Sequence, residues 1–260
     1  MTWAKIITAI SILVILFALA YGLFYLGIAG PPAPTSLRSL GAKYLEYMLG
    51  NNKYYTASSP EGVTAILWDY RGLDTLYETM VLFAAVIASV LIYREYLEKR
   101  ETRTRPRGLS LIVRSVSKII LWLTIIVSVG LGLTGQLTPG GGFVGGAAFA
   151  VVPVLVLLAY SVAYNVKLGI TKNRALLQRT IALLCLSAII LIPLLFSGYV
   201  FQNQLKPGTS FCYPGRFLDG TPLGGNLFFL NTAELFAVAG AFTLAFILLG
   251  LIAGAREEAP

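Results

Sequence analysis

Residues 68–78, Trp-Asp-Tyr-Arg-Gly-Leu-Asp-Thr-Leu-Tyr-Glu, place three carboxylates and one guanidinium directly before an apolar run from Thr79 to Tyr93. The chain as a whole is hydrophobic: 57% of its 260 residues are apolar, 12% are charged, and the mean hydropathy is +0.76. A soluble domain carries roughly a quarter charged residues. Ionisable groups beside a bilayer are costly and usually tied to function. Segment 68–78 is therefore the candidate functional element at the end of a membrane helix.

Several apolar runs exceed the roughly 18 residues that a membrane-spanning helix needs. We predict an all-α, polytopic membrane protein with about six transmembrane helices. The first run is longer than the apolar region of a secretory signal, about 7–15 residues, which favours an uncleaved helix. The third span could begin as early as Leu109, with Arg114 and Lys118 snorkelling. The predicted spans are Ile6–Ala29, Thr79–Tyr93, Ile119–Thr134, Phe143–Tyr164, Ile181–Val200 and Leu227–Ala253.

The connections between the predicted spans differ in charge. The segment 94–118 holds eight Lys or Arg against three Glu, and 167–179 holds four Lys or Arg without an acid. With both termini in the cytoplasm, 14 Lys and Arg lie inside and six outside, so the positive-inside bias predicts an N-in, C-in orientation. Segment 68–78 would then face outward. In the long outer connection before it, apolar residues at helical spacing predict a short amphipathic helix between Leu37 and Met48.

Composition also excludes several classes of function. The net charge of +8 lies in short loops between apolar runs, which favours membrane orientation over nucleic-acid binding. The chain has no histidine, the side chain most often used for proton transfer near neutral pH and for metal binding. Its cysteines, Cys185 and Cys212, form no CxxC, so we expect no metal site and no cofactor in this chain. A disulfide between the two stays open. With no nucleophile–base pair, we expect no catalytic site in this chain.

A glycine-rich segment joins the third and fourth predicted spans. It contains a formal GxGxxG, but no strand precedes it, so we reject a dinucleotide site. The glycines either permit close helix packing or line an ion path with open backbone N–H groups. We predict a glycine-rich helix-packing loop made of Pro139, Gly140, Gly141, Gly142, Gly145 and Gly146.

Glu234 lies inside the last apolar run. If this helix enters the membrane near Gly225, nine residues at 1.5 Å rise put Glu234 roughly 13 Å deep, near the midplane. A carboxylate at this depth predicts a functional role. The alternative is a capping box, with Asn231 as N-cap and Glu234 at N3. Both interpretations stay open, since a re-entrant helix start accommodates a cap and an ion ligand together.

Segment 68–78 has a similar alternative. Thr75 and Glu78 match a capping box that opens the second span, and Asp69, Arg71 and Asp74 could form an outer ion-pair network that holds the loop. Taken together, the charged residues more plausibly organise a polar site. The candidate ion-path residues are Asp69, Arg71, Asp74, Glu78 and Glu234. Elsewhere, Pro153 and Pro193 fall inside predicted spans, where each is expected to kink its helix.

Two segments resemble one known family, the Mrp-type multisubunit cation/proton antiporters. Val63–Glu78 resembles a motif near the C-terminal end of the A-type subunit of these antiporters, and residues 109–254, with Pro139–Gly146, are similar to their B-type subunit. The resemblance implies two units: residues 1–100, an A-like unit of two transmembrane helices with a long external loop, and residues 101–260, a B-like unit of four. One departure is clear. The B-type subunit usually carries histidine in a Gly-His-x-x-Pro-Gly-Gly-Gly-Phe pattern, whereas this chain has Gln136, which favours Na⁺ or a structural loop over a proton step there.

The same modules occur in membrane-bound hydrogenase and in membrane-bound sulfane sulfur reductase of archaea, usually as separate chains. The resemblance therefore implies an accessory, multi-pass subunit in the cell membrane that helps form a Na⁺/H⁺ path. Its partners would be the membrane subunits of an Mrp-like antiporter module and of a redox module, which would hold the iron–sulfur clusters. Na⁺ is one candidate for the transported ion, and the choice between Na⁺ and H⁺ stays open.

Three alternatives remain open at this point. The chain could serve a plain Mrp-type antiporter without redox partners, or act as a structural scaffold without ion traffic of its own. A stand-alone small transporter is the third alternative. It is disfavoured because no inverted repeat relates the two halves of the sequence.

Overall fold

The computed structural model describes residues 3–24, 38–48, 56–93, 109–204, 207–216, 218 and 220–256. The basic segment 94–108, Leu37, the end of the first predicted span and the acidic tail residues Glu257 and Glu258 lie outside the described residues. The fold is all-α, with one isolated antiparallel bridge between Arg216 and Pro222. The elements are α1 (Trp3–Phe24), α2 (Ser39–Met48), α3 (Gly62–Thr64), the π-helix η1 (Ala65–Tyr70), α4 (Gly72–Ile92), α6 (Leu111–Leu133), α7 (Gly142–Phe149), α8 (Val151–Ala159), α9 (Val162–Lys167), α10 (Lys172–Ser197) and α11 (Asn226–Arg256).

The predicted membrane helices are confirmed by number and type. By length and composition, five helical stretches can cross a membrane: α4, α6, Gly142–Ala159 from α7 and α8, α10, and Asn226–Gly250 of α11. The apolar part of α1, Ile10–Gly22, is a shorter sixth candidate. The predicted amphipathic helix is confirmed as α2. The N-in, C-in orientation stays a prediction.

Several helices begin earlier than the apolar pattern indicated, because their first turns are polar. α4 begins at Gly72, seven residues before the predicted apolar run, and α6 begins at Leu111, close to the earlier of the two proposed starts. α10 begins at Lys172, where the Thr171 hydroxyl accepts a hydrogen bond from the Arg174 amide at 3.4 Å. This N-cap satisfies one of the amides that every helix start leaves unpaired.

The two prolines predicted to kink their helices lie in different settings. Gly142–Ala159 is interrupted at Ala150, which separates α7 from α8, three residues before Pro153. Proline has no N–H and cannot bond back to the preceding turn, which accounts for an interruption there. α10 instead continues through Pro193 and ends at Ser197. The next residue, Gly198, has the left-handed conformation (φ 77°) that commonly terminates a helix.

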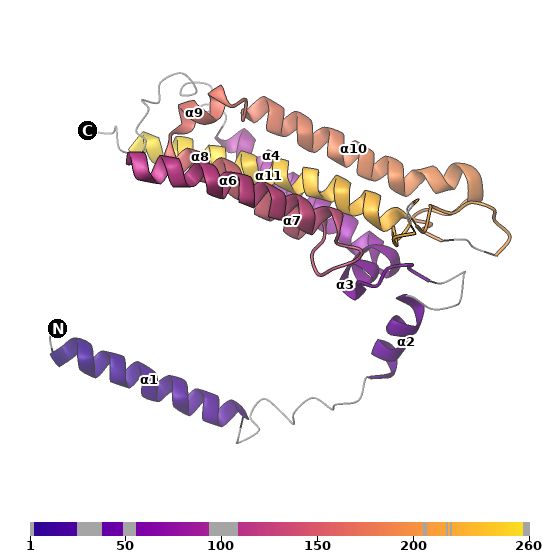
Figure 1. The fold of residues 1–260 in the computed structure, drawn as a ribbon, viewed down its shortest axis with the longest axis horizontal. Coiled ribbons are helices and arrows are strands. Elements are labelled where there is room, and N and C mark those ends of the chain that lie inside the picture. The colour runs from indigo at the N-terminus through magenta and orange to yellow at the C-terminus, as the bar shows by residue number, and fades with distance from the viewer. Residues whose placement is uncertain are drawn as a thin grey trace. The chain divides into compact units, whose positions relative to one another are not determined.

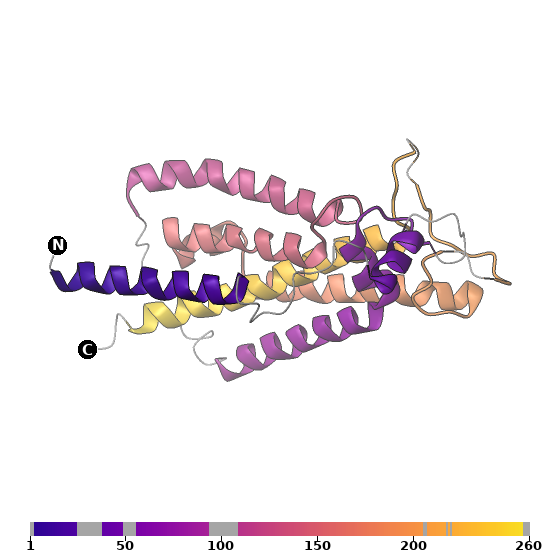
Figure 2. The same ribbon diagram turned by 90° about the horizontal axis from the view of Figure 1, so that it is seen from below.

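The long helix α11 is the centre of the unit Lys43–Pro260. It contacts α10, α7, α4, α6, α8, α9 and η1. Figure 1 shows α11 running between α10 and the α6–α8 layer. Figure 2 shows α4 and α6 on opposite sides of α11. Because α4 precedes residue 100 and α11 follows it, the two sequence-predicted units share one packed interior; the boundary itself stays a prediction.

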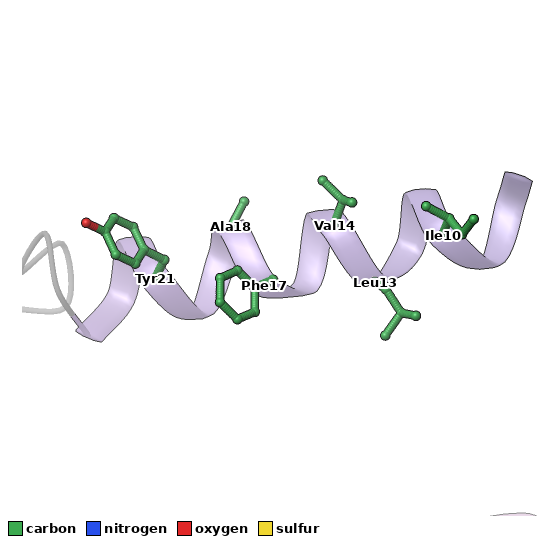
Figure 3. A pocket seen from close by; sticks show the side chains of 6 residues that line it. All are labelled: Ile10, Leu13, Val14, Phe17, Ala18 and Tyr21. Atoms are coloured by element: carbon green, nitrogen blue, oxygen red, sulfur yellow. The ribbon is translucent and has the colours of Figure 1, made fainter.

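The other compact unit, Met1–Ala42, contains α1. Its apolar side chains recur every three or four residues and form a stripe along the helix (Figure 3). Such an exposed apolar face is suited to lipid or to another membrane helix. The stripe consists of Ile10, Leu13, Val14, Phe17, Ala18 and Tyr21.

The helix bundle buries an apolar interior and also exposes a large apolar surface. One cluster joins η1, α10 and α11 through Trp68, Leu186, Leu227 and Leu230, all nearly inaccessible. On the outside, α6 exposes several large apolar side chains, among them Trp122. A soluble protein rarely shows such a surface, which agrees with a membrane location. The two cysteines are free and exposed, so they form no disulfide.

Candidate functional site

A short irregular segment between residues 56 and 71 leads into α4 and positions Trp68. The Glu61 carboxylate accepts a hydrogen bond from the Thr64 amide at 2.5 Å and caps α3. The chain then widens into the π-helix η1, a form often found at functional sites. Two hydroxyls bind the segment to the loop after α6: Ser59 donates to the Gln136 carbonyl at 2.6 Å and Thr64 to the Gly135 carbonyl at 2.7 Å.

Four of the five glycines of the predicted helix-packing loop lie where backbones nearly touch; Gly141 is the exception. A Cβ on Gly140 would come within 2.7 Å of the Leu131 carbonyl oxygen, and one on Gly145 within 2.7 Å of the Gly132 amide nitrogen. A Cβ on Gly146 would come within 2.6 Å of the Leu235 carbonyl oxygen. These distances leave no room for a side chain, so α7 packs closely against both α6 and α11. The same loop also lines a pocket, so packing and pocket lining coexist.

This pocket, which we call the carboxylate pocket, has a volume of about 270 Å³ and is formed by η1, α4, the glycine-rich loop, α7 and α11. It lies where segments 63–78, 140–144 and 231–234 meet. The two carboxylates on its wall come from Glu78 of α4 and Glu234 of α11. Its other polar groups include Thr75, Asn231 and the backbone of Gly141 and Gly142.

Glu234 is the buried carboxylate of the pocket, with a relative exposure of 5%. Its Oε2 accepts a hydrogen bond from the indole N–H of Trp68 at 3.3 Å. The N-terminus of α7 also faces it: a Cβ on Gly142 would come within 2.7 Å of the same oxygen. Helix N-termini stabilise negative charge through their free amides and dipole. The pocket therefore places the buried carboxyl group of Glu234 against an indole donor and a helix N-terminus.

Both predicted capping boxes are wrong. α11 begins at Asn226, so Asn231 and Glu234 lie inside it rather than at its start. The Asn231 side chain instead accepts a hydrogen bond from the Gly142 amide at 3.3 Å and so caps α7. Likewise α4 begins at Gly72, and Thr75 donates its hydroxyl to the Leu67 carbonyl at 2.7 Å. The local patterns failed because each helix begins before the proposed N-cap residue: α11 begins five residues before Asn231, and α4 begins three residues before Thr75.

The five candidate ion-path residues fall into three places. Glu78 and Glu234 line the carboxylate pocket together. Asp69 lines a separate pocket of about 530 Å³ with Tyr70. Arg71 and Asp74 form an ion pair at 2.5 Å whose side chains are 59% and 55% exposed. An exposed pair of this kind contributes little to stability, and it does not reach the carboxylate pocket.

The charges of segment 68–78 alter the titration of two of its own groups. The hydrogen bond from the Arg71 guanidinium to the Asp74 carboxylate raises the pKa of Arg71 above its ordinary value. Partial burial, with a smaller contribution from the negative charge of Asp69, raises the pKa of Tyr70 to about 12. Both groups therefore keep their protons over the whole physiological range.

Two buried side chains escaped the sequence analysis. Trp68 stood out there only as a neighbour of Asp69, although its indole N–H is the donor to Glu234. Arg179 was assigned to the cytoplasmic loop 167–179, but it lies in the second turn of α10 with a relative exposure of 1%. The extended start of α10 explains this error. In the part of the chain that the structure describes, no three His, Cys, Asp or Glu side chains gather as a metal site.

Fold and pocket together define a multi-pass helical membrane protein with a carboxylate pocket inside its bundle. Residues 112–244, just over half of the chain, match the family of domains related to the MnhB subunit of Na⁺/H⁺ antiporters. The chain belongs to this family. The match lies in the segment whose resemblance to the B-type antiporter subunit was apparent from sequence, and it confirms that resemblance.

Three similar proteins extend the comparison. An uncharacterized protein from Methanocaldococcus jannaschii is 29% identical over 209 residues, which cover 73% of this chain and 77% of that protein. A chain of the membrane-bound sulfane sulfur reductase, an archaeal respiratory membrane complex, is 26% identical with a TM-score of 0.64, over 96% of this chain and 98% of that chain. A chain of the Mrp complex from Dietzia sp. covers 100% of this chain with a TM-score of 0.64 at 18% identity, which is a likeness of fold. This chain spans 27% of the length of that Mrp chain.

Proposed function

We propose that this chain is an accessory membrane subunit of a multisubunit, ion-translocating redox complex and that the carboxylate pocket belongs to its Na⁺/H⁺ path. The observation that carries the proposal is the meeting of Glu78 and Glu234 at one pocket. These carboxylates are 156 positions apart in sequence and come from the two segments that resemble different antiporter subunits, the A-type and the B-type. Glu234 is buried in the bundle and Glu78 is exposed at the edge of the pocket. Ionisable residues within membrane-spanning segments typically mark cation and proton paths.

The chemistry of the pocket suits a small hard cation or a proton. Carboxylate, amide and backbone carbonyl oxygens are the ligands that such cations prefer. A cation and a proton each compensate the same buried negative charge, so arrival of one favours departure of the other. Electron transfer would take place in partner subunits that hold iron–sulfur clusters, and this chain would contribute no catalytic group.

The extent and the identity of the matches to known chains both support one type of parent complex over the other. The match to the sulfane sulfur reductase chain extends over nearly the whole of both chains, which supports a complex of the sulfane sulfur reductase or hydrogenase type. A plain Mrp-type antiporter is the second candidate, supported by the family match over 112–244. Purification of the tagged chain with its native partners distinguishes the two candidate complexes. An iron–sulfur or NiFe-type subunit should co-purify with the chain from a redox complex and should be missing from a plain antiporter.

The ion-path role is tested by Glu78→Gln and Glu234→Gln in the assembled complex. Each change removes one charge at nearly constant volume, and each is expected to lower driven Na⁺ uptake into inverted vesicles at least roughly tenfold, as loss of a charged ligand does. Glu46→Gln on the exposed face of α2 is the matched control and should transport like wild type. Wild-type uptake by assembled Glu78→Gln and Glu234→Gln complexes would leave a scaffold role.

Trp68 offers a direct test of cation binding, because its indole donates to Glu234. With Trp3 and Trp122 replaced by phenylalanine, Trp68 is the remaining indole in the sequence. Its fluorescence should shift in a saturable way as NaCl replaces choline chloride, and Glu234→Gln should abolish the shift. An equal response in the Glu234→Gln variant would show that the signal does not come from the pocket.

A further inference from the structure

Arg179 carries a buried guanidinium and does not line the carboxylate pocket. It lies in α10 with a relative exposure of 1%, and its Nε and Nη1 have no hydrogen-bond partner among the described residues. Its guanidinium carbon lies 5.1 Å from the centre of the Phe83 ring on α4. On the α11 side, Gly240 leaves room for it: a Cβ there would come within 3.1 Å of Arg179 Cβ. A cation with unmet donors is unfavourable inside a membrane bundle, and stacking on a ring offsets this only in part.

Two helices independently locate this charge relative to the carboxylate pocket. Along α4, Phe83 comes five residues after Glu78, which corresponds to about 7.5 Å of helix rise. Along α11, Gly240 comes six residues after Glu234, or about 9 Å. Both helices run away from the pocket in the same direction, since their later residues Val86 and Leu244 pack in one cluster. Arg179 therefore lies about one and a half turns beyond the pocket, within the interface of α4, α10 and α11.

The groups between and beyond these positions change from polar to apolar. Thr79 lies one turn after Thr75 on the inner face of α4, is buried, and donates its hydroxyl to the Thr75 carbonyl at 2.9 Å. Arg179 follows. Further along, the helices pack through apolar clusters that contain Val86, Ala175, Ala241 and Leu244, and then Ile247 and Leu248.

The opposite side of the pocket is open. Of its lining residues, Val63 is 58% exposed, and Phe143 and Val144 are each 49% exposed. The pocket thus has an accessible mouth on the surface of α3 and α7, and Arg179 lies further along α4 and α11 on the other side.

We infer that Arg179 is a cation barrier, a fixed positive charge that closes the α4–α10–α11 interface beyond the carboxylate pocket. A cation held between Glu78 and Glu234 would be repelled from this interface and would leave through the mouth beside Val63 and Val144. The barrier rests on the proposed function, because it assigns a role to Arg179 only if cations enter the pocket. It makes the pocket a dead end within this chain, so onward passage requires another protein of the complex at the mouth.

The barrier is tested by passive ²²Na⁺ flux through the assembled complex in proteoliposomes without an electron donor. Arg179→Met, which has similar length and no charge, is expected to raise passive Na⁺ flux at least roughly tenfold, since a unit charge in a low-dielectric interface repels cations over several ångströms. Arg179→Lys keeps the charge and should stay within roughly twofold of wild type. Phe83→Leu is the matched control, because it removes the stacked ring but keeps the charge, and its flux should equal that of wild type.

Three results would overturn the barrier. One is wild-type Na⁺ flux in an assembled Arg179→Met complex. Another is a parallel rise in passive glucose flux, which would indicate loosened packing rather than lost repulsion. The third is a leak in Arg179→Lys as large as in Arg179→Met. If Arg179→Met does not assemble, Arg179→Gln is measured with the same expectations.

Failure of the barrier and failure of the proposed function are separable. The barrier is read from passive flux in the Arg179 variants, whereas the ion-path role is read from driven uptake in Glu78→Gln and Glu234→Gln. Adding Glu234→Gln to Arg179→Met connects the two. This double variant should return to low passive flux if cations reach the barrier by way of the pocket.

Discussion

Gly146→Ala is expected to destabilise the protein, whereas Gly130→Ala is not. Gly146 lies in α7 against α11, where a Cβ would come within 2.6 Å of the Leu235 carbonyl oxygen and 2.7 Å of Val238 Cβ. Gly130 lies in α6, and a Cβ there would meet no atom within 4 Å outside its own helix backbone. The two substitutions therefore add the same methyl group to a helix, once at a close contact and once in open space.

The magnitude follows from two opposing effects. Alanine in place of an interior helical glycine stabilises by about 0.5–1 kcal/mol, because it restricts the unfolded backbone. Forcing a methyl group into a packed contact costs about 1–3 kcal/mol. The backbone gain is common to both variants and cancels in the comparison. Gly146→Ala should therefore have a free energy of unfolding about 1–3 kcal/mol below that of Gly130→Ala.

Unfolding of the purified chain in mixed micelles, followed by tryptophan fluorescence as the fraction of denaturing detergent rises, measures this difference. Gly130→Ala should unfold at or slightly above the wild-type midpoint and Gly146→Ala clearly below it. Equal midpoints for the two variants would refute the close packing of α7 on α11, and with it the shape of the carboxylate pocket.

Three further predictions concern the segment before α4 and the orientation of the chain. Thr64→Val leaves the buried Gly135 carbonyl without its hydroxyl donor and should lower the free energy of unfolding by about 1–3 kcal/mol, whereas Thr180→Val, at an exposed hydroxyl, should change it little. Because the pKa of Tyr70 is about 12 in the folded state and 10.0 ordinarily, the folded state keeps this proton longer; stability should fall as pH rises from 10.0 toward about 12, and Tyr70→Phe should flatten that fall in alkaline unfolding curves. In an N-in, C-in chain Cys212 lies outside, so a membrane-impermeant maleimide should label the protein in intact cells, and the Cys212→Ser variant should stay unlabelled. Labelling of Cys212 only in inverted vesicles would show the opposite orientation.

Most of the fold could be predicted from the sequence, because length and apolar content decide whether a segment can cross a membrane. The helix boundaries were harder to predict, since polar side chains can occupy the first turns of a membrane helix. α10 shows this most clearly. Its first residues include the polar or charged side chains Lys172, Arg174, Gln178 and Arg179, which are typical of a loop, yet all four lie in the helix. Their loop-like composition concealed the buried charge at Arg179.

The sequence allowed individual residues of the site to be predicted, but it did not predict how they are arranged. Glu78, Glu234 and the glycine-rich loop could each be singled out, because carboxylates and clustered glycines are conspicuous in an apolar chain. The donor to Glu234 could not be found, since Trp68 is 166 residues away and no local sequence pattern connects the two residues. The outlying positions of Asp69, Arg71 and Asp74 depend on how η1 turns into α4, which the spacing of charges does not encode.

Glu78 and Glu234 belong to one polypeptide, which has a consequence for assembly. The A-like and B-like segments that carry them are synthesised in equal numbers. They meet in an intramolecular step, at an effective concentration on the order of millimolar for a short linker. Separate chains would instead have to find each other at their expression levels. Joining the two segments covalently thus sets their stoichiometry and prevents one half from entering a complex without the other.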